Sequence, residues 1–241
     1  MRGGSTMLLR AEGITKVFHR NEKILKGVTL EIKEKTFTVM LGPSGSGKST
    51  LLNVLSGMLK PTEGQVWFEE KSITQMKEKE VAKWKREEIG NIFQNYLLLD
   101  NLTVKENIEV GLREDTKEAP EKGLSLNELV QFLEIENILN KFPAELSGGQ
   151  QQRVAIARAV IKKPRLLFCD EATGALDEAN SKKVVALLHR LCEQYGITIL
   201  FVTHNSQIAR TADRVITIKD GQIYKDLINT HPISAHEMIW E

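Results

Sequence analysis

A glycine-rich segment with one lysine has the residue types that bind phosphate. Its residues match the pattern G-x-x-x-x-G-K-[ST]: Gly42, Pro43, Ser44, Gly45, Ser46, Gly47, Lys48, Ser49 and Thr50. The glycines allow successive backbone N–H groups to surround a phosphate, and a helix N-terminus adds partial positive charge. We expect Lys48 to reach the β- and γ-phosphates of a nucleotide and Ser49 to ligate Mg²⁺. A plain turn before a helix is the alternative, but the strand and helix predicted on either side favour phosphate binding.

Two adjacent carboxylates, Asp170 and Glu171, follow the apolar run 166–169. Successive side chains on a strand point in different directions, so the two acids can do different work. We expect Asp170 to reach the Mg²⁺ shell and Glu171 to act as a general base on a water molecule that attacks the γ-phosphate. A solvated acidic pair at a strand end is the alternative. Cys169, in the same run, is expected to be a buried packing residue and not a nucleophile.

A second helix start carries polar and glycine residues: Leu146, Ser147, Gly148, Gly149 and Gln150. Ser147 is a suitable N-cap. The glycine pair weakens a helix and would let a phosphate approach the backbone closely. The segment therefore indicates a second anion-binding helix terminus, with a simple helix cap as the alternative.

The elements that must position these residues alternate along the chain. Apolar runs rich in β-branched residues, typical of buried parallel strands, occupy residues 36–41, 89–93, 166–169, 198–202 and 214–218. Amphipathic segments with helical periodicity occupy residues 48–56, 150–161 and 177–195. This alternation predicts an α/β fold in which helices cover a sheet.

Three segments depart from that alternation. Residues 215–224 form two short runs around Asp220-Gly221, which predicts a hairpin. Residues 28–32 alternate in a similar way, so an antiparallel part is expected. The charged run 77–88 mixes both signs and predicts a solvated helix face and not a basic binding strip.

The middle of the chain, from about 95 to 160, is rich in helix signals and predicts a helical insertion into the α/β core. A polar stretch at 116–123 interrupts it as a loop. Ser125 and Glu128 have the spacing of a capping box, for a helix that ends near Phe132.

The composition is that of an ordinary globular protein. The 241 residues are 41% hydrophobic and 27% charged, with a formal net charge of +1. This balance gives no field to hold nucleic acid, so no nucleic-acid partner is expected. Two cysteines, no signal peptide and apolar runs far shorter than the roughly 20 residues of a membrane span favour a reducing cytosol. Residues 1–6 are expected to be a remnant of an expression tag.

In this order the motifs resemble those of the ATP-binding cassette (ABC) ATPases, the nucleotide-binding subunits of ABC transporters. The resemblance spans roughly residues 8–224. Beside the segments above, it includes the family's adenine-stacking aromatic residue, Q-loop, D-loop and switch histidine, here Phe18, Gln94, residues 174–177 and His204.

The resemblance implies a role for each of these residues. Phe18 would stack on adenine, with core packing as the alternative. Gln94 would touch Mg²⁺ or the attacking water, with a solvated strand end as the alternative. His204 would hydrogen-bond the γ-phosphate and orient the water of Glu171. The other four histidines are given no role.

The implied fold class is α/β: a P-loop NTPase core with a mostly parallel sheet, an antiparallel β part and a helical subdomain. Residues 7–226 would form the ABC ATPase domain, with the helical subdomain inserted at about 95–160. Residues 227–241 would form a C-terminal tail.

The resemblance also implies ATP, Mg²⁺ and two protein partners. In a head-to-tail homodimer, Ser147, Gly149 and Gln150 of one subunit would close over the γ-phosphate that Lys48 of the other holds. A separate integral membrane permease would place the cytoplasmic subunit peripherally on the inner face of the cell membrane. The permease would dock near residues 95–99, whose leucines have core packing as an equal alternative.

Within the family, residues 146–153 and 174–177 resemble the branch of macrolide export, lipoprotein release and bacitracin resistance. Members of that branch usually have Pro at Ala172, Asp at Asn205 and an acidic-glycine pair at Lys35-Thr36. The resemblance implies an exporter or extrusion system for peptide, lipoprotein or drug-like substrates. The alternative is an ABC ATPase that drives a non-transport assembly or cell-division partner. A DNA-repair ATPase is disfavoured because no heptad run predicts a coiled coil.

Overall fold

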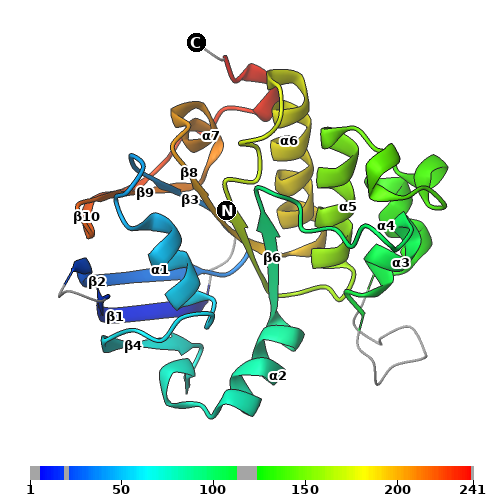
Figure 1. The fold of residues 1–241 in the computed structure, drawn as a ribbon. Coiled ribbons are helices and arrows are strands. Elements are labelled where there is room, and N and C mark those ends of the chain that lie inside the picture. Colours follow the sequence, from blue (N-terminus) through cyan, green and yellow to red (C-terminus); the bar gives the residue numbers. More distant parts are fainter. Residues whose placement is uncertain (1–5, 19–21, 113–123, 240–241) are drawn as a thin grey trace.

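The computed structural model describes residues 6–18, 22–112 and 124–239. The predicted loop at 116–123 and all but Thr6 of the predicted tag remnant lie outside the described residues. Within the described ranges the chain forms two sheets and two groups of helices (Figure 1).

The central sheet has six strands in the order β10-β9-β3-β8-β7-β6. Their bounds are β3 Phe37–Leu41, β6 Ile89–Phe93, β7 Leu166–Asp170, β8 Thr198–Thr203, β9 Arg214–Lys219 and β10 Gln222–Ile228. All neighbouring pairs are parallel except β9 and β10, which form the predicted hairpin. The five predicted parallel strands are therefore confirmed, β6 with the same bounds.

A second, antiparallel sheet has the order β2-β1-β4-β5. Its strands are β1 Met7–Val17, β2 Lys23–Lys33, β4 Glu63–Phe68 and β5 Lys71–Ser72. The alternating residues 28–32 belong to a longer strand, β2, whose inward-facing positions are buried. This sheet lies beside α1, Lys48–Leu55, at the lower left of Figure 1.

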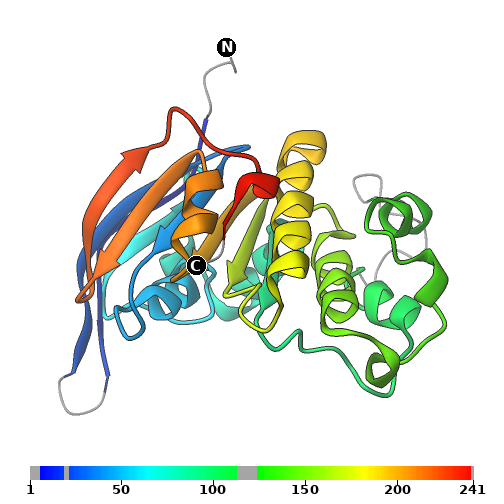
Figure 2. The same cartoon turned by 90° about the horizontal axis from the view of Figure 1, so that it is seen from above.

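The other helices divide into those on the central sheet and those beyond it. The first group comprises α2 Glu78–Glu88, α5 Gly148–Val160, α6 Glu178–Tyr195 and α7 Ser206–Thr211; the second comprises α3 Val104–Glu109 and α4 Leu126–Phe132. Short 3₁₀ turns occupy Ile73–Gln75, Glu136–Ile138, Pro143–Glu145 and Ala235–Glu237. In Figures 1 and 2, α3, α4 and α5 lie on the far side of α6 from the antiparallel sheet.

Local signals place the helix ends. The predicted capping box of α4 is confirmed, because the Ser125 hydroxyl accepts from the Glu128 N–H and the Glu128 carboxylate accepts from the Ser125 N–H. The helix predicted at 150–161 begins earlier, at Gly148, because Ser147 already caps it. In α2 only Trp84 is buried, as a solvated helix face requires.

Two hydrophobic clusters hold the central sheet from opposite sides. Successive residues of β8 divide between them: Leu200 packs toward the antiparallel sheet and α1, and Phe201 toward α5 and α6. The segment after β10 joins the second cluster, since Ala235 and Met238 are buried in it. In Figure 2 this segment, in red, runs back to α6. The strand β10 itself ends at Ile228, two residues into the predicted tail.

Candidate functional site

The glycine-rich segment, here called the P-loop (residues 42–50), joins β3 to α1 at the carboxyl end of the central sheet. Beside it is a cleft of about 720 Å³. The residues that line this cleft are Ile24, Pro43, Ser44, Gly45, Gly47, Lys48, Ser49, Thr50, Gln94, Glu171, Gly174 and His204. The ends of β6, β7 and β8 thus bring three predicted site residues to the loop, as parallel strands do.

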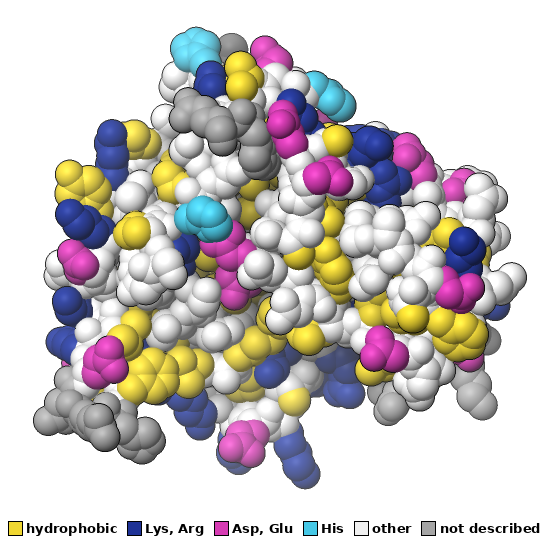
Figure 3. Space-filling model, turned by 45° about the horizontal axis from the view of Figure 1, so that its top comes forward, with side chains coloured by type: hydrophobic (Ala, Val, Ile, Leu, Met, Phe, Trp, Pro, Cys, Tyr) yellow, Lys and Arg dark blue, Asp and Glu magenta, His cyan; other side chains and the backbone are white. Residues whose placement is uncertain are grey.

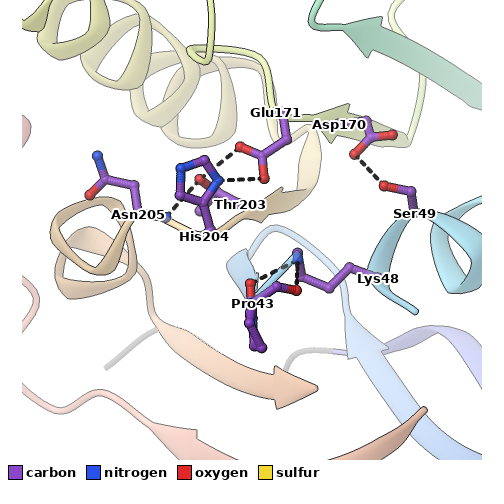
Figure 4. A network of polar contacts seen from close by, with 9 residues as sticks. Pro43, Lys48, Ser49, Asp170, Glu171, Thr203, His204 and Asn205 are labelled. Carbon is purple, nitrogen blue, oxygen red and sulfur yellow. Dashed lines mark hydrogen bonds and ion pairs between the residues drawn. The ribbon is translucent and has the colours of Figure 1, made fainter. Parts of the chain in front are cut away.

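The Lys48 ammonium lies inside the loop that it belongs to. It donates hydrogen bonds to the carbonyl oxygens of Gly42 and Pro43, each at 2.8 Å (Figure 4). The residue is only 6% exposed. Burial lowers the pKa of Lys48, while the carboxylates of Glu171 and Asp170 favour its charged form. A cation is therefore held at the cleft wall, ready to exchange carbonyl partners for phosphate oxygens.

Ser49 and Asp170 form the candidate Mg²⁺ site. The Ser49 hydroxyl donates to the Asp170 carboxylate at 3.1 Å. Burial raises the pKa of Asp170, and the neighbouring Glu171 carboxylate adds to the rise. Ligands of octahedral Mg²⁺ at about 2.1 Å lie about 3 Å from one another, and Mg²⁺ prefers few protein oxygens together with phosphate and water. The two oxygens fit this ion by type and by separation.

Glu171 forms the second polar pair of the cleft. Its carboxylate lies 3.0 Å from Nδ1 of His204 and accepts a hydrogen bond from the Thr203 hydroxyl at 3.3 Å. The Thr203 hydroxyl also accepts from the Asn205 N–H, so β8 and the start of α7 are tied to Glu171 (Figure 4). Glu171 has a φ of 48°, an uncommon value for a residue with a side chain and one that is often found at functional sites.

Gln94 lies across the cleft at the end of β6. Its amide is close to Gly174, where a Cβ would stand 2.8 Å from Nε2 of Gln94. Gly174 therefore allows the D-loop to pass close beside the glutamine. Cys169, which precedes the acidic pair, is fully buried, and burial raises its pKa, which agrees with a packing role.

Seven predicted site residues are not among those that line this cleft. Gly42, Ser46 and Asp170 directly adjoin residues that line it, whereas Phe18, Ser147, Gly149 and Gln150 lie elsewhere. Phe18 is 43% exposed at the end of β1, and the Lys16 ammonium lies 5.3 Å from its ring centroid. Ser147, Gly149 and Gln150 lie at the start of α5, where Ser147 and Gln150 cap each other reciprocally. Within one chain, the P-loop and the α5 start are therefore separate.

The glycine pair at the α5 start has neighbours within its own chain. A Cβ on Gly149 would stand 2.8 Å from Oδ1 of Asn180, and a Cβ on Gly148 would stand 3.1 Å from the Tyr96 hydroxyl. The close approach that the two glycines suggested is therefore made, in part, by α6 and by the segment after Gln94.

The leucines after Gln94 had two interpretations from the sequence, a docking surface for a permease and core packing, and the structure has both exposed and core-packed leucines. Leu98 packs against the core, whereas Leu97 is 54% and Leu99 42% exposed. On the face in Figure 3, hydrophobic side chains are interspersed with charged ones.

Sequence reasoning did not select three residues that the structure brings to the site. Thr203 could have been found, because it immediately precedes His204 at the end of a predicted strand. Gly174 was noted only as part of the D-loop. Ile24 carried no local signal, because it reaches the cleft through the packing of β2 on the P-loop.

Comparison with known proteins assigns the family. The family model described as ABC transporter matches residues 25–174. The chain belongs to the ABC transporter family. The cassette is 43% identical over 217 residues to a putative ABC transporter ATP-binding protein of Mycoplasma pneumoniae, covering 90% of this chain and 46% of that protein. The chain thus spans about half the length of this relative.

Other relatives match over most of both chains. The bacitracin export ATP-binding protein BceA of Halalkalibacterium halodurans is 44% identical, over 86% of this chain and 81% of its own. The lipoprotein-releasing system ATP-binding protein LolD of Aquifex aeolicus is 42% identical, over 91% and 97%. Together with a macrolide export protein, they confirm the branch that the sequence resembles.

A solved structure confirms the fold class. The dimeric ABC transporter cassette MJ0796 superposes with a TM-score of 0.81 at 38% identity, over 92% of this chain and 98% of that one. The same cassette is known in a post-hydrolysis state bound to ADP and Pi. The chain accordingly has the fold of an ABC transporter cassette. Within the residues that the structure describes, no helix combines the length and apolarity needed to cross a membrane.

Proposed function

We propose that this cassette supplies the energy of an exporter or extrusion system, and that the cleft beside the P-loop is its ATPase site. One observation supports this above all. Lys48, the Ser49–Asp170 pair and the Glu171–His204 pair come together at one cleft from three places, the P-loop and the ends of β7 and β8 (Figure 4). A phosphate cation, a metal site and a general base are the parts that phosphoryl transfer to water needs.

The geometry suggests how these groups divide the work. Lys48 leaves its carbonyl partners to bind the β- and γ-phosphates, together with the P-loop N–H groups. Ser49, Asp170 and Gln94 would hold Mg²⁺, which neutralises phosphate charge when bound. Glu171 accepts a proton from the attacking water. His204 positions the Glu171 carboxylate and hydrogen-bonds the γ-phosphate. Phe18, exposed at the end of β1, offers a ring face to the adenine.

The cassette is proposed to work as a head-to-tail homodimer. Ser147, Gly149 and Gln150 do not line the cleft of their own chain, and they stand at the start of α5, where Ser147 is exposed. In a twofold dimer this helix end of each subunit would close over the γ-phosphate of the other. The dimeric solved relative supports this arrangement.

The membrane partner is proposed to be a separate permease that docks on the exposed Leu97 and Leu99. Its presence would place the cassette on the cytoplasmic face of the cell membrane. The named relatives act in bacitracin export and lipoprotein release. We propose a peptide, lipoprotein or drug-like substrate for the same reason.

The test of the site is Glu171→Gln. The amide keeps the shape of the side chain but cannot accept the proton, so phosphate release should fall by about 100-fold or more while ATP binding persists. Glu136→Gln, at an exposed glutamate beyond the cleft, is the control and should keep full turnover. Wild-type phosphate release by Glu171→Gln would contradict the assignment of the base.

A further inference from the structure

The C-terminal hairpin lies against the P-loop because of strand order. In the parallel pairing of β3 and β9, Leu41 is opposite Thr217. The next residues along each strand, Gly42 and Ile218, approach so closely that a Cβ on Gly42 would stand 2.3 Å from the Ile218 carbonyl oxygen. The P-loop therefore begins in contact with the end of β9.

The turn that follows β9 makes hydrogen bonds to two other segments. Gln222 pairs with Lys219, which leaves Asp220 and Gly221 as a two-residue turn. Both have positive φ, 51° and 76°, as a type I′ turn requires. The Gly221 N–H donates to the Ser46 carbonyl of the P-loop at 3.0 Å, and the Gly221 carbonyl accepts from the Lys26 N–H of β2 at 2.9 Å.

Strand β2 closes the space between the turn and the P-loop. A Cβ on Gly221 would stand 2.0 Å from the Ile24 carbonyl oxygen. A Cβ on Gly47 would stand 3.3 Å from the same oxygen. One backbone carbonyl is therefore enclosed between two glycines, and no methyl group fits on the Gly221 side.

The hydrogen bond from Gly221 controls the direction of a P-loop donor. The Ser46 carbonyl and the Gly47 N–H belong to one planar trans peptide group, so they point in opposite directions. Holding the carbonyl toward the turn directs the Gly47 N–H away from it, and Gly47 lines the cleft. The buried hydroxyl of Ser46 makes no hydrogen bond, so it does not help to hold this peptide group.

We propose that the β9–β10 turn is a rigid support of the phosphate-binding loop, and that Gly221 is a positioning residue for nucleotide binding. The proposal rests on the proposed role of the P-loop. Gly221 is not among the residues that line the cleft. It acts through the Ser46–Gly47 peptide, which it holds between β9 and β2.

The test is the affinity for MgATP of Gly221→Ala, measured by titration calorimetry. The added methyl group pushes the turn away from Ile24 and Ser46, so affinity should fall about tenfold or more. The matched control is Gly196→Ala, which has a similar φ of 67° but only ordinary contact, 3.4 Å to Lys35 Cε. It should lose thermal stability and keep its affinity. Affinity of Gly221→Ala within about twofold of the wild type would overturn the proposal.

A second measurement needs no substitution at the turn. In the ¹⁵N-labelled wild type, MgADP should shift the Gly221 amide resonance and slow its hydrogen exchange, because the acceptor of this amide lies in the P-loop. The Gly196 amide, bonded to Cys192 of its own helix, is the internal reference. An unchanged Gly221 resonance and exchange rate in the presence of bound MgADP would also overturn the proposal.

Lys48→Ala distinguishes a failure of this proposal from a failure of the proposed P-loop function on which it rests. If Lys48→Ala binds MgATP like the wild type, the P-loop assignment fails and the support proposal fails with it. If Lys48→Ala loses binding while Gly221→Ala keeps it, only the support proposal fails. Loss of binding in both variants, with Gly196→Ala unaffected, is the result that supports both.

Discussion

At the scale of single residues, each charged group of the site that binds phosphate or metal is hydrogen-bonded to neutral groups of the protein. Lys48 is satisfied by two P-loop carbonyls, and Asp170 by the Ser49 hydroxyl. Each pair satisfies a buried or partly buried polar group that would otherwise be costly. Lys48 can exchange its carbonyl partners for phosphate oxygens, and Ser49 and Asp170 can exchange their mutual hydrogen bond for Mg²⁺. Nucleotide binding is therefore an exchange of partners within the cleft.

Asn205 shows that a departure from the usual family residue can be neutral. Its side chain accepts from the Gln207 N–H and caps α7 directly after His204. Asn and Asp are comparable N-caps, so the helix start that positions His204 does not need the carboxylate.

A partly buried histidine outside the site, His189, predicts how stability depends on pH. His189 stacks on Phe37 with ring centroids 3.9 Å apart. Its Nε2 lies 2.9 Å from the Thr211 hydroxyl, which donates to Ile208, so the neutral ring donates through Nε2. Burial lowers the pKa of His189 from 6.5, against the opposing influence of the Asp213 and Glu193 carboxylates.

The sign follows from proton linkage. Because the unfolded chain binds a proton near pH 6.5 and the folded chain resists it, the free energy of unfolding should fall as pH drops below about 6.5. His189→Phe keeps the stacked ring but cannot titrate. Urea unfolding between about pH 7.5 and 5.5 should show a smaller decline in this variant. Parallel declines in the wild type and the variant would contradict the assignment.

At the scale of elements, α5 joins two parts of the proposed mechanism. Ser147 caps its N-terminus, and near its other end the Arg158 guanidinium donates to the carbonyls of Leu97 at 2.6 Å and Tyr96 at 2.9 Å. Tyr96 and Leu97 both have positive φ, which is unfavourable for such residues. The strained segment that follows Gln94 is thus held to the helix that Ser147 caps.

Arg158→Met should loosen that connection. The thioether keeps most of the packing, but two carbonyls lose a charged donor, so the free energy of unfolding should fall by about 2–3 kcal/mol. ATP turnover should fall as well, because Gln94 loses its anchored neighbour. Urea unfolding and phosphate release measure the two effects.

Arg153→Met is the matched control on the same helix. Arg153 donates to the Leu133 carbonyl and to Glu134, away from Gln94. It should lower stability and leave turnover unchanged. Equal turnover in Arg158→Met and Arg153→Met would show that the Arg158 contacts serve stability alone.

Sequence patterns predicted the elements better than the contacts between them. The strand of Ile89–Phe93 and the capping box of Ser125 follow from local composition, which a sequence displays directly. The approaches of Gly221 to Ser46 and of Gly149 to Asn180 join distant segments and leave no periodic signal. The P-loop could be predicted because its chemistry is contained in nine consecutive residues. The residues of other segments that support the P-loop, such as Gly221, could not be predicted in this way.

At the scale of the whole molecule, the distance between the P-loop cleft and the α5 start predicts that activity needs two copies. Ser147→Arg places bulk and charge on the proposed closing surface. ATP binding to the single subunit should persist, while hydrolysis and ATP-dependent dimerisation fail. Phosphate release and size-exclusion chromatography, the latter in the Glu171→Gln background, measure these outcomes.

The matched control is Ser125→Arg. Ser125 caps α4 with the same reciprocal geometry, so both variants should lose about 1 kcal/mol from the cap. Only Ser147→Arg should lose hydrolysis. Full turnover by Ser147→Arg would refute the role of this serine in the partner's site.

The strand order of the central sheet also determines at what stage of ribosomal synthesis the P-loop cleft can form. β3, which leads into the P-loop, lies between β8 and β9, and both come from the last quarter of the chain. The antiparallel strands β1, β2 and β4 are close in sequence and can pair early, whereas β3 emerges from the ribosome with both of its edges unpaired. A nascent chain that ends before Thr198 should therefore expose an apolar strand, bind no nucleotide and depend on chaperones until its final strands arrive.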